Sequence, residues 1–455
     1  MMFKLSWLNS RKILIFAAFI DYVFYYSLFF NKFNEPILNK SILIFLCIVN
    51  TLTWVISSYI FGRYENSPKG RYQILINQIG KLFLTIIFNI LLNLFLFRIF
   101  WNWDYMNFKS FSNFLSNFSN FYFLISIFSF LFQLFLNFYL LKKYKDKFLW
   151  LFLGTKKREI YLKKLIGSRT NINIKFFNPE FLKDKNINIK GIIIDDEEFL
   201  KEKNIQFIFD LNNKGMKFMK VSNWCERYLN RYPSELVKTT EIIEGQFNYN
   251  KHSLKGRIKR IGESFLSLII LIGTFPIFLI SALAIVLEDG GPVFYSQIRD
   301  GFEGKQFKII KLRTMIINAE TNGAQWSDST DKRITNVGKI LRKLRIDELP
   351  QLLLVLSGEM SLIGPRPERP KIDQFLRDKL PNYDLRYSIK PGISGWAQVN
   401  YPYGASIEDS KYKLSYDLYY IKNFSILLDF MILFKTLRLV LNGKGSKPIR
   451  KIKSP

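Results

Sequence analysis

Four long apolar segments in the first third of the chain constrain its fold more than any other feature. They run Ile13–Phe30, Ile42–Phe61, Leu82–Phe97 and Phe121–Leu141. Each approaches the roughly 20 residues that a helix needs to cross a bilayer, and we expect the third to extend at both ends. No small-residue cleavage site follows the first segment, which argues against a removed signal peptide. The sequence therefore predicts a helical membrane domain of four spans over residues 1–145.

Lysine and arginine flank these segments unevenly. Basic residues precede the first segment and follow the second and fourth, whereas the other two loops carry fewer. Because positive residues favour the cytoplasmic side, both ends of the bundle are predicted to lie in the cytoplasm. One acid, Asp21, lies inside the first segment. We favour a hydrogen bond in the bundle interior for it, with a functional role as the alternative.

The composition limits the chemistry that this chain can perform. Net charge is +29 and 49% of residues are hydrophobic. A general bias toward lysine accounts for part of the charge, and basic residues beside apolar segments suit an anionic membrane surface, so nucleic acid is not a predicted partner. The single histidine, His252, excludes His-rich zinc chemistry and argues against a Ser-His-Asp hydrolase. The distant Cys47 and Cys225 predict neither a disulfide framework nor a metal site.

The middle of the chain is soluble in character. Short β-rich runs lie at Asn171–Phe177, Ile189–Asp195 and Gln206–Leu211, with helical patterns between and after them. This alternation predicts a small α/β domain with a parallel sheet, which we place over residues 146–240. The polar stretch 241–260 is expected to be a linker.

The chemistry is concentrated between Leu341 and Pro370. There the adjacent carboxylates Asp347 and Glu348 lie between a basic run and a Gly-Pro-Arg-Pro turn. Neighbouring acids raise each other's pKa unless cations offset the repulsion. An acid pair among arginines suits phosphoryl transfer: one carboxylate attacks phosphorus, the other holds a metal, and guanidinium groups bind phosphate oxygens. Prolines on both sides of Arg366 fix the backbone and pre-aim its side chain.

Several ordered motifs make this half of the chain resemble the bacterial sugar transferase family, the polyprenyl-phosphate hexose-1-phosphate transferases or monotopic phosphoglycosyl transferases. The motifs are DELPQ, SGEMSLIGPRPERP and KPGISGWAQVN, and the resemblance covers residues 255–446 closely. An isolated Asp-Glu pair is ordinarily part of a solvated helix face. In the company of these motifs, we interpret Asp347 and Glu348 as a catalytic pair.

The resemblance implies a role for each residue of the site. Asp347 is expected to be the nucleophile, and Glu348 the ligand of a Mg²⁺ cofactor. Lys311 and Arg313 lie two residues apart on a predicted strand, Phe307–Met315, and face one side of it. They join a predicted phosphate-binding set that comprises Lys311, Arg313, Arg333, Arg342 and Arg366. The nucleotide or sugar is assigned to Gln297, Arg299, Trp396 and Gln398, with a buried core aromatic as the alternative for Trp396.

A fifth apolar segment, Ile261–Leu287, is long enough to span a bilayer but has Pro276 at its centre. Proline removes a backbone hydrogen bond and kinks or breaks a helix. A plain span would place the catalytic part outside, away from a cytoplasmic nucleotide-sugar. We therefore expect a re-entrant helix that returns at Pro276, a feature of the family, with a plain span as the alternative. Where the family usually has Asp near the start of this helix, the chain has Glu263.

The long branch of the family supplies the remaining expectations. It implies four N-terminal membrane helices, a degenerate Rossmann-like middle domain, a re-entrant helix, and a mixed α/β catalytic domain over residues 288–455. That domain is expected to end in an interfacial helix at Ser425–Leu441. The protein would lie in the bacterial inner membrane with its catalytic domain in the cytoplasm.

The implied reaction transfers a sugar-1-phosphate from a UDP-sugar to polyprenyl (undecaprenyl) phosphate. It releases UMP, gives polyprenyl-diphosphate-sugar, and begins exopolysaccharide or lipopolysaccharide repeat-unit assembly. The expected partners are the UDP-sugar, polyprenyl phosphate and the bilayer, and a homodimer is left open. The alternative is a non-catalytic membrane scaffold for polysaccharide assembly. A glycosyltransferase with a DxD metal motif is disfavoured because no Asp-x-Asp occurs in the catalytic half.

Overall fold

The structure is a computed structural model of the 455-residue chain. It describes residues 12–33, 40–64, 71–100, 108–143, 148–166, 172–177, 189–195, 215–248, 253–317, 333–401 and 406–441, together with the single residues 211, 213, 319 and 331. The chain divides into two compact units, one ending at Lys220 and the other beginning at Val221. We describe each unit by itself.

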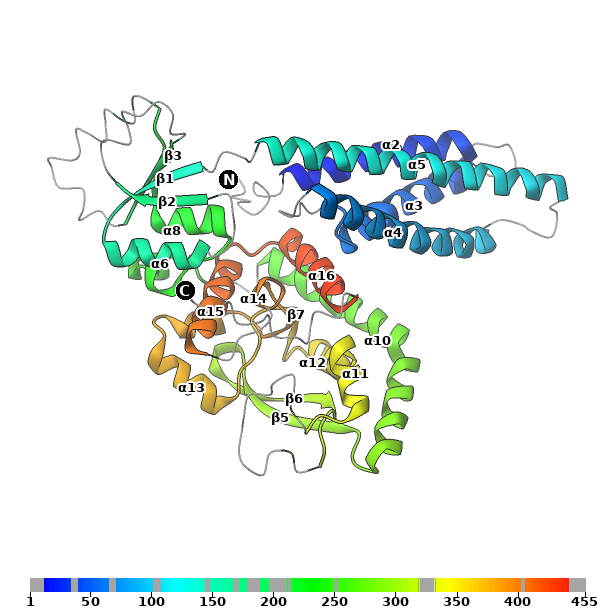
Figure 1. The fold of residues 1–455 in the computed structure, drawn as a ribbon. Coiled ribbons are helices and arrows are strands. Elements are labelled where there is room, and N and C mark those ends of the chain that lie inside the picture. Colours follow the sequence, from blue (N-terminus) through cyan, green and yellow to red (C-terminus); the bar gives the residue numbers. More distant parts are fainter. Residues whose placement is uncertain are drawn as a thin grey trace. The chain divides into compact units, whose positions relative to one another are not determined.

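The N-terminal unit begins with four apolar helices, which confirms the helical prediction for this region. They are α2 (Lys12–Phe33), α3 (Lys40–Ile60), α4 (Arg71–Phe100) and α5 (Phe108–Lys143) (Figure 1). The third helix extends beyond its apolar segment at both ends, as expected. By length and composition, α2, α4 and α5 each contain a stretch able to cross a membrane, and α3 carries a shorter apolar stretch, Ile44–Ile60.

Polar side chains lie inside this helical bundle as well as aromatic ones. Asp21 is fully buried and accepts hydrogen bonds from the hydroxyls of Ser129 (2.8 Å) and Tyr64 (2.9 Å). Arg63 lies 3.9 Å from the same carboxylate. Because Asp21 has these partners within the bundle, the structure agrees with the interior hydrogen bond that we favoured for it.

A four-stranded parallel sheet follows the bundle. Its strands are β1 (Phe148–Leu153), β2 (Ile172–Phe176), β3 (Ile189–Ile194) and β4 (Phe218–Lys220), in the order β2-β1-β3-β4, and α6 (Lys156–Ile166) connects β1 to β2. Two predicted β-rich runs are therefore strands, whereas residues 206–210 of the third lie outside the described residues. Strand β1 was not predicted, because its apolar run directly follows the last membrane segment. The Rossmann-like classification stays a prediction.

The C-terminal unit is mixed α/β, as predicted. An antiparallel pair joins β5 (Phe294–Asp300) to β6 (Gln306–Leu312), and a parallel pair joins β7 (Ser361–Ile363) to β8 (Gly392–Ser394). The α-helices are α8 (Val221–Trp224), α9 (Thr239–Ile243), α10 (Leu254–Asp289), α11 (Asn336–Leu344), α12 (Leu352–Ser357), α13 (Pro370–Lys379), α14 (Trp396–Asn400), α15 (Ile407–Lys422) and α16 (Ile426–Leu441). A π-helical turn, η4 (Cys225–Leu229), follows α8, and short 3₁₀ helices are η5 (Ser234–Leu236), η6 (Phe302–Gly304), η7 (Ile346–Gln351) and η8 (Tyr383–Ser388).

The residues that follow the sheet pack into the C-terminal unit. The indole of Trp396 donates to the carbonyl of Asn230 (3.0 Å), and the guanidinium of Arg231 lies 4.4 Å from the ring of Tyr416. The division after Lys220 therefore falls earlier than the end we predicted for the middle domain, residue 240. The predicted domain bounds as a whole stay predictions.

Helix α10 is one 36-residue element that contains Pro276, and its middle is apolar and exposed. Its N-terminal turns are tied to the C-terminal unit, because Lys259 pairs with Glu263 (2.9 Å) and with Asp429 of α16 (2.8 Å). Glu263 also accepts from the hydroxyl of Ser361 at 2.6 Å, so glutamate makes the anchoring contact at this position. At the other end, Glu288 accepts from the first backbone amides of α11. The same unit thus holds both ends of the helix.

Candidate active site

The acid pair lies on a short 3₁₀ helix between two α-helices. Arg345, in the left-handed region at φ 57°, ends α11 and begins η7. This sharp change of direction brings Asp347 and Glu348 against strand β6, so that only 8% and 5% of their surfaces remain exposed. A solvated helix face is therefore excluded for this pair.

Three cations surround Glu348. One of its oxygens lies 2.5 Å from the guanidinium of Arg345, and the other lies 2.9 Å from Arg366 and 3.9 Å from the ammonium of Lys311. These charges hold the pKa of Glu348 well below its usual range despite its burial. Of the two acids, Glu348 therefore forms ion pairs with these cations, whereas Asp347 has no ion pair among the described residues.

The pKa of Asp347 shifts in the opposite direction to that of Glu348. Burial, followed by the charge of Glu348, raises the pKa of Asp347 to about 6, while Lys311 and nearby arginines oppose the shift. The same burial lowers the pKa of Lys311 to about 8. Near neutral pH the site therefore holds an ionised Asp347 beside a charged Lys311, with Glu348 neutralised by its cations.

Two arginine side chains hold the Gly-Pro-Arg-Pro turn in place by donating hydrogen bonds to its backbone carbonyls. Arg386 donates to the carbonyl of Arg366 (2.6 Å), and Arg299 donates to the carbonyl of Pro367 (3.2 Å). Gly364 packs so closely on the chain at Lys390 that an added Cβ would lie 2.3 Å from its carbonyl oxygen. These contacts hold the start of the Arg366 side chain in place and leave its guanidinium to reach Glu348.

The predicted phosphate-binding residues do not form one cluster. Lys311 and Arg366 meet at Glu348, whereas Arg313 pairs with Asp289 at the end of α10. Arg333 pairs with Asp331 (2.6 Å), and Arg342 donates to the hydroxyl of Thr314 (2.8 Å). Lys311 and Arg366 thus lie at the acid pair, and Arg313 instead ties α10 to the end of β6. The roles of all these residues stay predictions.

The residues predicted to bind the nucleotide or sugar are also separated. Gln297 accepts from Arg299 at 2.9 Å, and Arg299 also donates to the carbonyl of Pro367 in the Arg366 turn. Trp396 is 1% exposed, lies parallel to Tyr419 with ring centroids 5.9 Å apart, and has Lys435 4.4 Å from its ring. Its surroundings are those of the core aromatic that we gave as the alternative. Gln398 instead lines a pocket.

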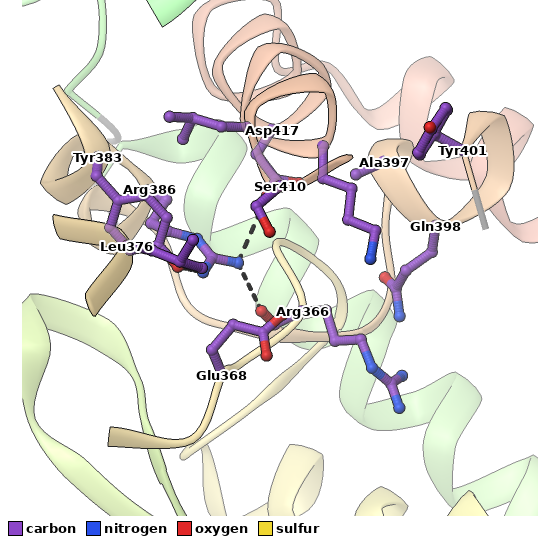
Figure 2. Close-up of a pocket in the computed structure, with 12 residues that line it drawn as sticks. Arg366, Glu368, Leu376, Tyr383, Arg386, Ala397, Gln398, Tyr401, Ser410 and Asp417 are labelled. Carbon is purple, nitrogen blue, oxygen red and sulfur yellow. Dashed lines mark hydrogen bonds and ion pairs between the residues drawn. The ribbon is translucent and has the colours of Figure 1, made fainter. Parts of the chain in front are cut away.

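That pocket, which we name the Arg366 pocket, is a small open cavity of about 50 Å³. It is lined by the Arg366 turn and by residues of α13, η8, α14 and α15: Arg366, Glu368, Leu376, Tyr383, Arg386, Ala397, Gln398, Tyr401, Ser410, Lys413, Leu414 and Asp417. Figure 2 shows Arg386 between Asp417 and the backbone of Arg366. Arg366 therefore both lines the pocket and contacts Glu348 of the acid pair.

Sequence reasoning did not assign several of these residues to the site. Arg345 belongs to the basic run before the acid pair, and its spacing of three residues from Glu348 was the available signal. Lys413 and Asp417 lie on α15, four residues apart, and nothing in the local sequence relates them to Arg366. Only the packing of distant elements brings them to the pocket.

A magnesium ion would find few protein ligands here. Within the described residues, no three His, Cys, Asp or Glu side chains gather into a metal site. Mg²⁺ commonly takes one or two carboxylates and completes its shell with water and substrate phosphates. Glu348 fits that pattern, because each carboxylate oxygen keeps a second lone pair beside its arginine.

The C-terminal half matches known proteins. The profile described as "Bacterial sugar transferase" matches residues 254–443. A UDP-N-acetylgalactosamine-undecaprenyl-phosphate N-acetylgalactosaminephosphotransferase from Aeromonas hydrophila is 50% identical over 192 residues, which are 42% of this chain and 45% of the relative. A UDP-glucose:undecaprenyl-phosphate glucose-1-phosphate transferase from Klebsiella pneumoniae is 39% identical over 208 residues, covering 44% and 45%.

A shorter relative is matched over most of its length. It is an uncharacterized sugar transferase of Bacillus subtilis, 40% identical over 192 residues, which cover 41% of this chain and 89% of the relative. The chain matches less than half the length of the Aeromonas and Klebsiella proteins. The shared part contains the acid pair, the Arg366 turn and helix α10. From this match and the motifs that carry it, the chain belongs to the bacterial sugar transferase family.

Proposed function

We propose that the protein transfers a sugar-1-phosphate from a UDP-sugar to polyprenyl (undecaprenyl) phosphate. The observation that carries the proposal is the buried acid pair, in which Glu348 takes the ion pairs and Asp347 is left without one among the described residues. Relatives named as undecaprenyl-phosphate sugar-phosphate transferases support the reaction type. The product would be polyprenyl-diphosphate-sugar, the first intermediate of exopolysaccharide or lipopolysaccharide repeat units.

The reaction proceeds by two displacements at one phosphorus. A carboxylate oxygen of Asp347 attacks the β-phosphorus of the donor, the bond from that phosphorus to the bridging oxygen breaks, and UMP leaves with that oxygen. An oxygen of the polyprenyl phosphate then attacks the same phosphorus and releases the Asp347 carboxylate. An ionised Asp347 needs no base to activate it, which suits a site without histidine.

The cations beside Glu348 would stabilise the negative charge that develops on the phosphate oxygens during transfer. Arg366 and Lys311 lie within reach of the same carboxylate oxygen, so they also lie where phosphate oxygens of the donor would meet the acid pair. Glu348 would hold a Mg²⁺, which when bound supplies further positive charge for the diphosphate. Arg366 presents a planar fork suited to bidentate phosphate binding.

We propose that helix α10 holds this chemistry at the membrane surface. One unit holds its N-terminal turns, through Lys259 and Glu263, and its C-terminal end, through Glu288. A helix with both ends on one domain cannot span the bilayer unless that domain lies on both sides. We therefore propose that α10 re-enters at Pro276, with the catalytic unit on the cytoplasmic face of the inner membrane.

A non-catalytic scaffold is the second candidate that the sequence left open. Such a role gives no reason to bury two adjacent carboxylates and surround one of them with Arg345, Arg366 and Lys311. Burying charges costs free energy, which structural proteins usually avoid. The transferase therefore accounts for the site better.

The decisive experiment looks for the covalent intermediate. Incubation with a sugar-labelled UDP-sugar and Mg²⁺, without lipid acceptor, should add one phosphosugar to the intact protein, and peptide mapping should locate it on Asp347. Asp347→Asn keeps the shape but removes the anionic oxygen, so adduct formation and turnover should both fall by roughly 10³-fold or more.

The matched control is Asp378→Asn, which changes an exposed carboxylate on α13 that carries no proposed role. It should label as the wild type does. An adduct on another residue, or substantial turnover by Asp347→Asn, would remove Asp347 as nucleophile. Product that forms only with both substrates present, with no adduct under any condition, would instead indicate a single displacement.

A further inference from the structure

We infer that Gln351 is a further catalytic residue, whose side-chain N–H donates a hydrogen bond to the phosphoryl group while Asp347 carries it. The inference rests on the proposed function, because it names a second contact to the group that is transferred. Gln351 forms and breaks no covalent bond in this reaction. Its task would be to stabilise negative charge on one phosphoryl oxygen.

The side chain of Gln351 is buried, with 4% of the residue exposed. Its amide nitrogen is enclosed and has no hydrogen-bond partner among the described residues. A buried N–H without an acceptor costs free energy, so folded proteins contain few of them. Where such a group lies beside a candidate active site, a ligand is the expected source of its acceptor.

The short helix η7 brings Gln351 to the acid pair. Residues three apart lie over one another on a 3₁₀ helix. The ion pair between Arg345 and Glu348, at 2.5 Å, shows that this spacing joins side chains here, and Gln351 is the next residue in the same series. Because η7 continues directly into α12, Gln351 also follows Asp347 by four residues, the spacing of one α-helical turn.

The polar side chains of η7 are of two kinds. Glu348 is engaged by three cations. Asp347 has no ion pair, and the nitrogen of Gln351 has no hydrogen bond, among the described residues. These two residues are one turn apart, so a phosphoryl group bound to Asp347 would present an oxygen to Gln351. The cations around Glu348 would meet another of its oxygens.

An amide N–H suits an oxygen whose charge increases during the reaction. It is a neutral donor, so it adds no charge to a site in which Glu348 is already balanced by its cations. A fixed donor in a buried site stabilises the transition state more than the bound substrate, because the oxygen gains charge as the reaction proceeds. Gln351 should therefore affect the rate of adduct formation more than the KM for the donor.

The test replaces the amide by side chains of matched length. Gln351→Met removes both the donor and the acceptor, whereas Gln351→Glu keeps an oxygen but lacks the N–H. Full-length protein in lipid nanodiscs would be incubated with UDP-glucose, UDP-galactose, UDP-N-acetylglucosamine or UDP-N-acetylgalactosamine. The measurements are the rate of adduct formation, the KM for the donor, the Mg²⁺ concentration that gives half the maximal rate, and the unfolding temperature. The control is Gln374→Met, which changes an exposed glutamine on α13.

We expect Gln351→Met to slow adduct formation by roughly 100-fold, the usual effect of removing one hydrogen-bond donor from a transition state. The KM for the donor should change by less than about threefold. The unfolding temperature should not fall, because the nitrogen that is lost has no partner among the described residues. Gln351→Glu should be at least as slow, since it lacks the N–H and adds a negative charge beside two acids. The control should match the wild type in every measurement.

Other results would overturn the inference. A normal rate in Gln351→Glu, or a raised Mg²⁺ requirement as the main effect of Gln351→Met, would make the amide oxygen a metal ligand instead. A lower unfolding temperature together with lost activity would make the amide a structural group, and an unchanged rate in Gln351→Met would remove it from the reaction. If the wild type forms adduct on Asp347, each of these results leaves the proposed function intact. If the wild type forms no adduct with any donor, the proposed function fails and the inference fails with it.

Discussion

Two residues of the site, Asp347 and Lys311, have pKa values that bracket neutral pH. Burial raises the pKa of Asp347 to about 6 and lowers that of Lys311 to about 8. Attack requires ionised Asp347, so adduct formation should fall as pH decreases through about 6. Phosphate binding requires charged Lys311, so it should also fall as pH increases through about 8. The measurement is the single-turnover rate of adduct formation against pH.

The variant that checks this assignment is Lys311→Arg. Arginine stays charged throughout the accessible range, so the alkaline decline should move upward by a pH unit or more while the acidic decline stays in place. Lys308→Arg, on an exposed position of the same strand, is the matched control and should leave the profile unchanged. An alkaline decline that survives in Lys311→Arg would assign it to another group.

At the scale of elements, the proposed re-entry of helix α10 at Pro276 would decide which side of the membrane the catalytic unit occupies. Both of its ends contact one unit, and Pro276 interrupts the hydrogen bonding of its exposed apolar middle. A cysteine at Lys308, which is exposed on β6, should therefore resist an impermeant thiol reagent in intact cells and react after the membrane is opened. The native Cys47 and Cys225 are buried, which keeps background labelling low.

A cysteine at Asn31, near the end of α2, provides the external control for that experiment. The charge distribution places this end of the first span outside, so it should react in intact cells. Labelling at Lys308 from outside would mean that α10 crosses the membrane. Gly301 is a poorer position for the probe, because an added Cβ would lie 2.8 Å from the ring of Phe307.

At the scale of the whole molecule, the proposed catalytic residues and the N-terminal helices belong to different units. The division after Lys220 leaves the acid pair, the Arg366 pocket and α10 in one unit, which also contains residues 254–443 matched by the family profile. A truncated chain that begins at Val221 should therefore still form the phosphosugar adduct in membranes, within about a factor of ten of the full chain.

A chain that begins at Leu254 is the informative comparison. It lacks Asn230, which accepts from Trp396, and Glu241, which pairs with Lys422 at 3.1 Å. Each lost contact leaves a buried or half-buried polar group without its partner, so this shorter chain should unfold at a lower temperature. If the chain that begins at Val221 forms no adduct although it is folded, the N-terminal unit contributes to catalysis directly.

The sequence by itself determined the features whose physical cause is local. Runs of apolar residues long enough for a bilayer predicted the four N-terminal helices, because hydrocarbon admits only backbone that is hydrogen-bonded within itself. The motifs around them identified Asp347 and Glu348, and two prolines marked the Arg366 turn. None of these inferences needed contacts between distant residues.

Only the tertiary structure decided which charges meet. Lys311 reaches Glu348 whereas Arg313, two residues later, pairs with Asp289, because the chain leaves β6 between them and turns toward the end of α10. Trp396 is buried against α15, and Lys413 comes to a pocket beside a turn 47 residues earlier in the chain. Side-chain partners across such separations depend on how helices and strands pack, and that packing has no signature in a local stretch of sequence.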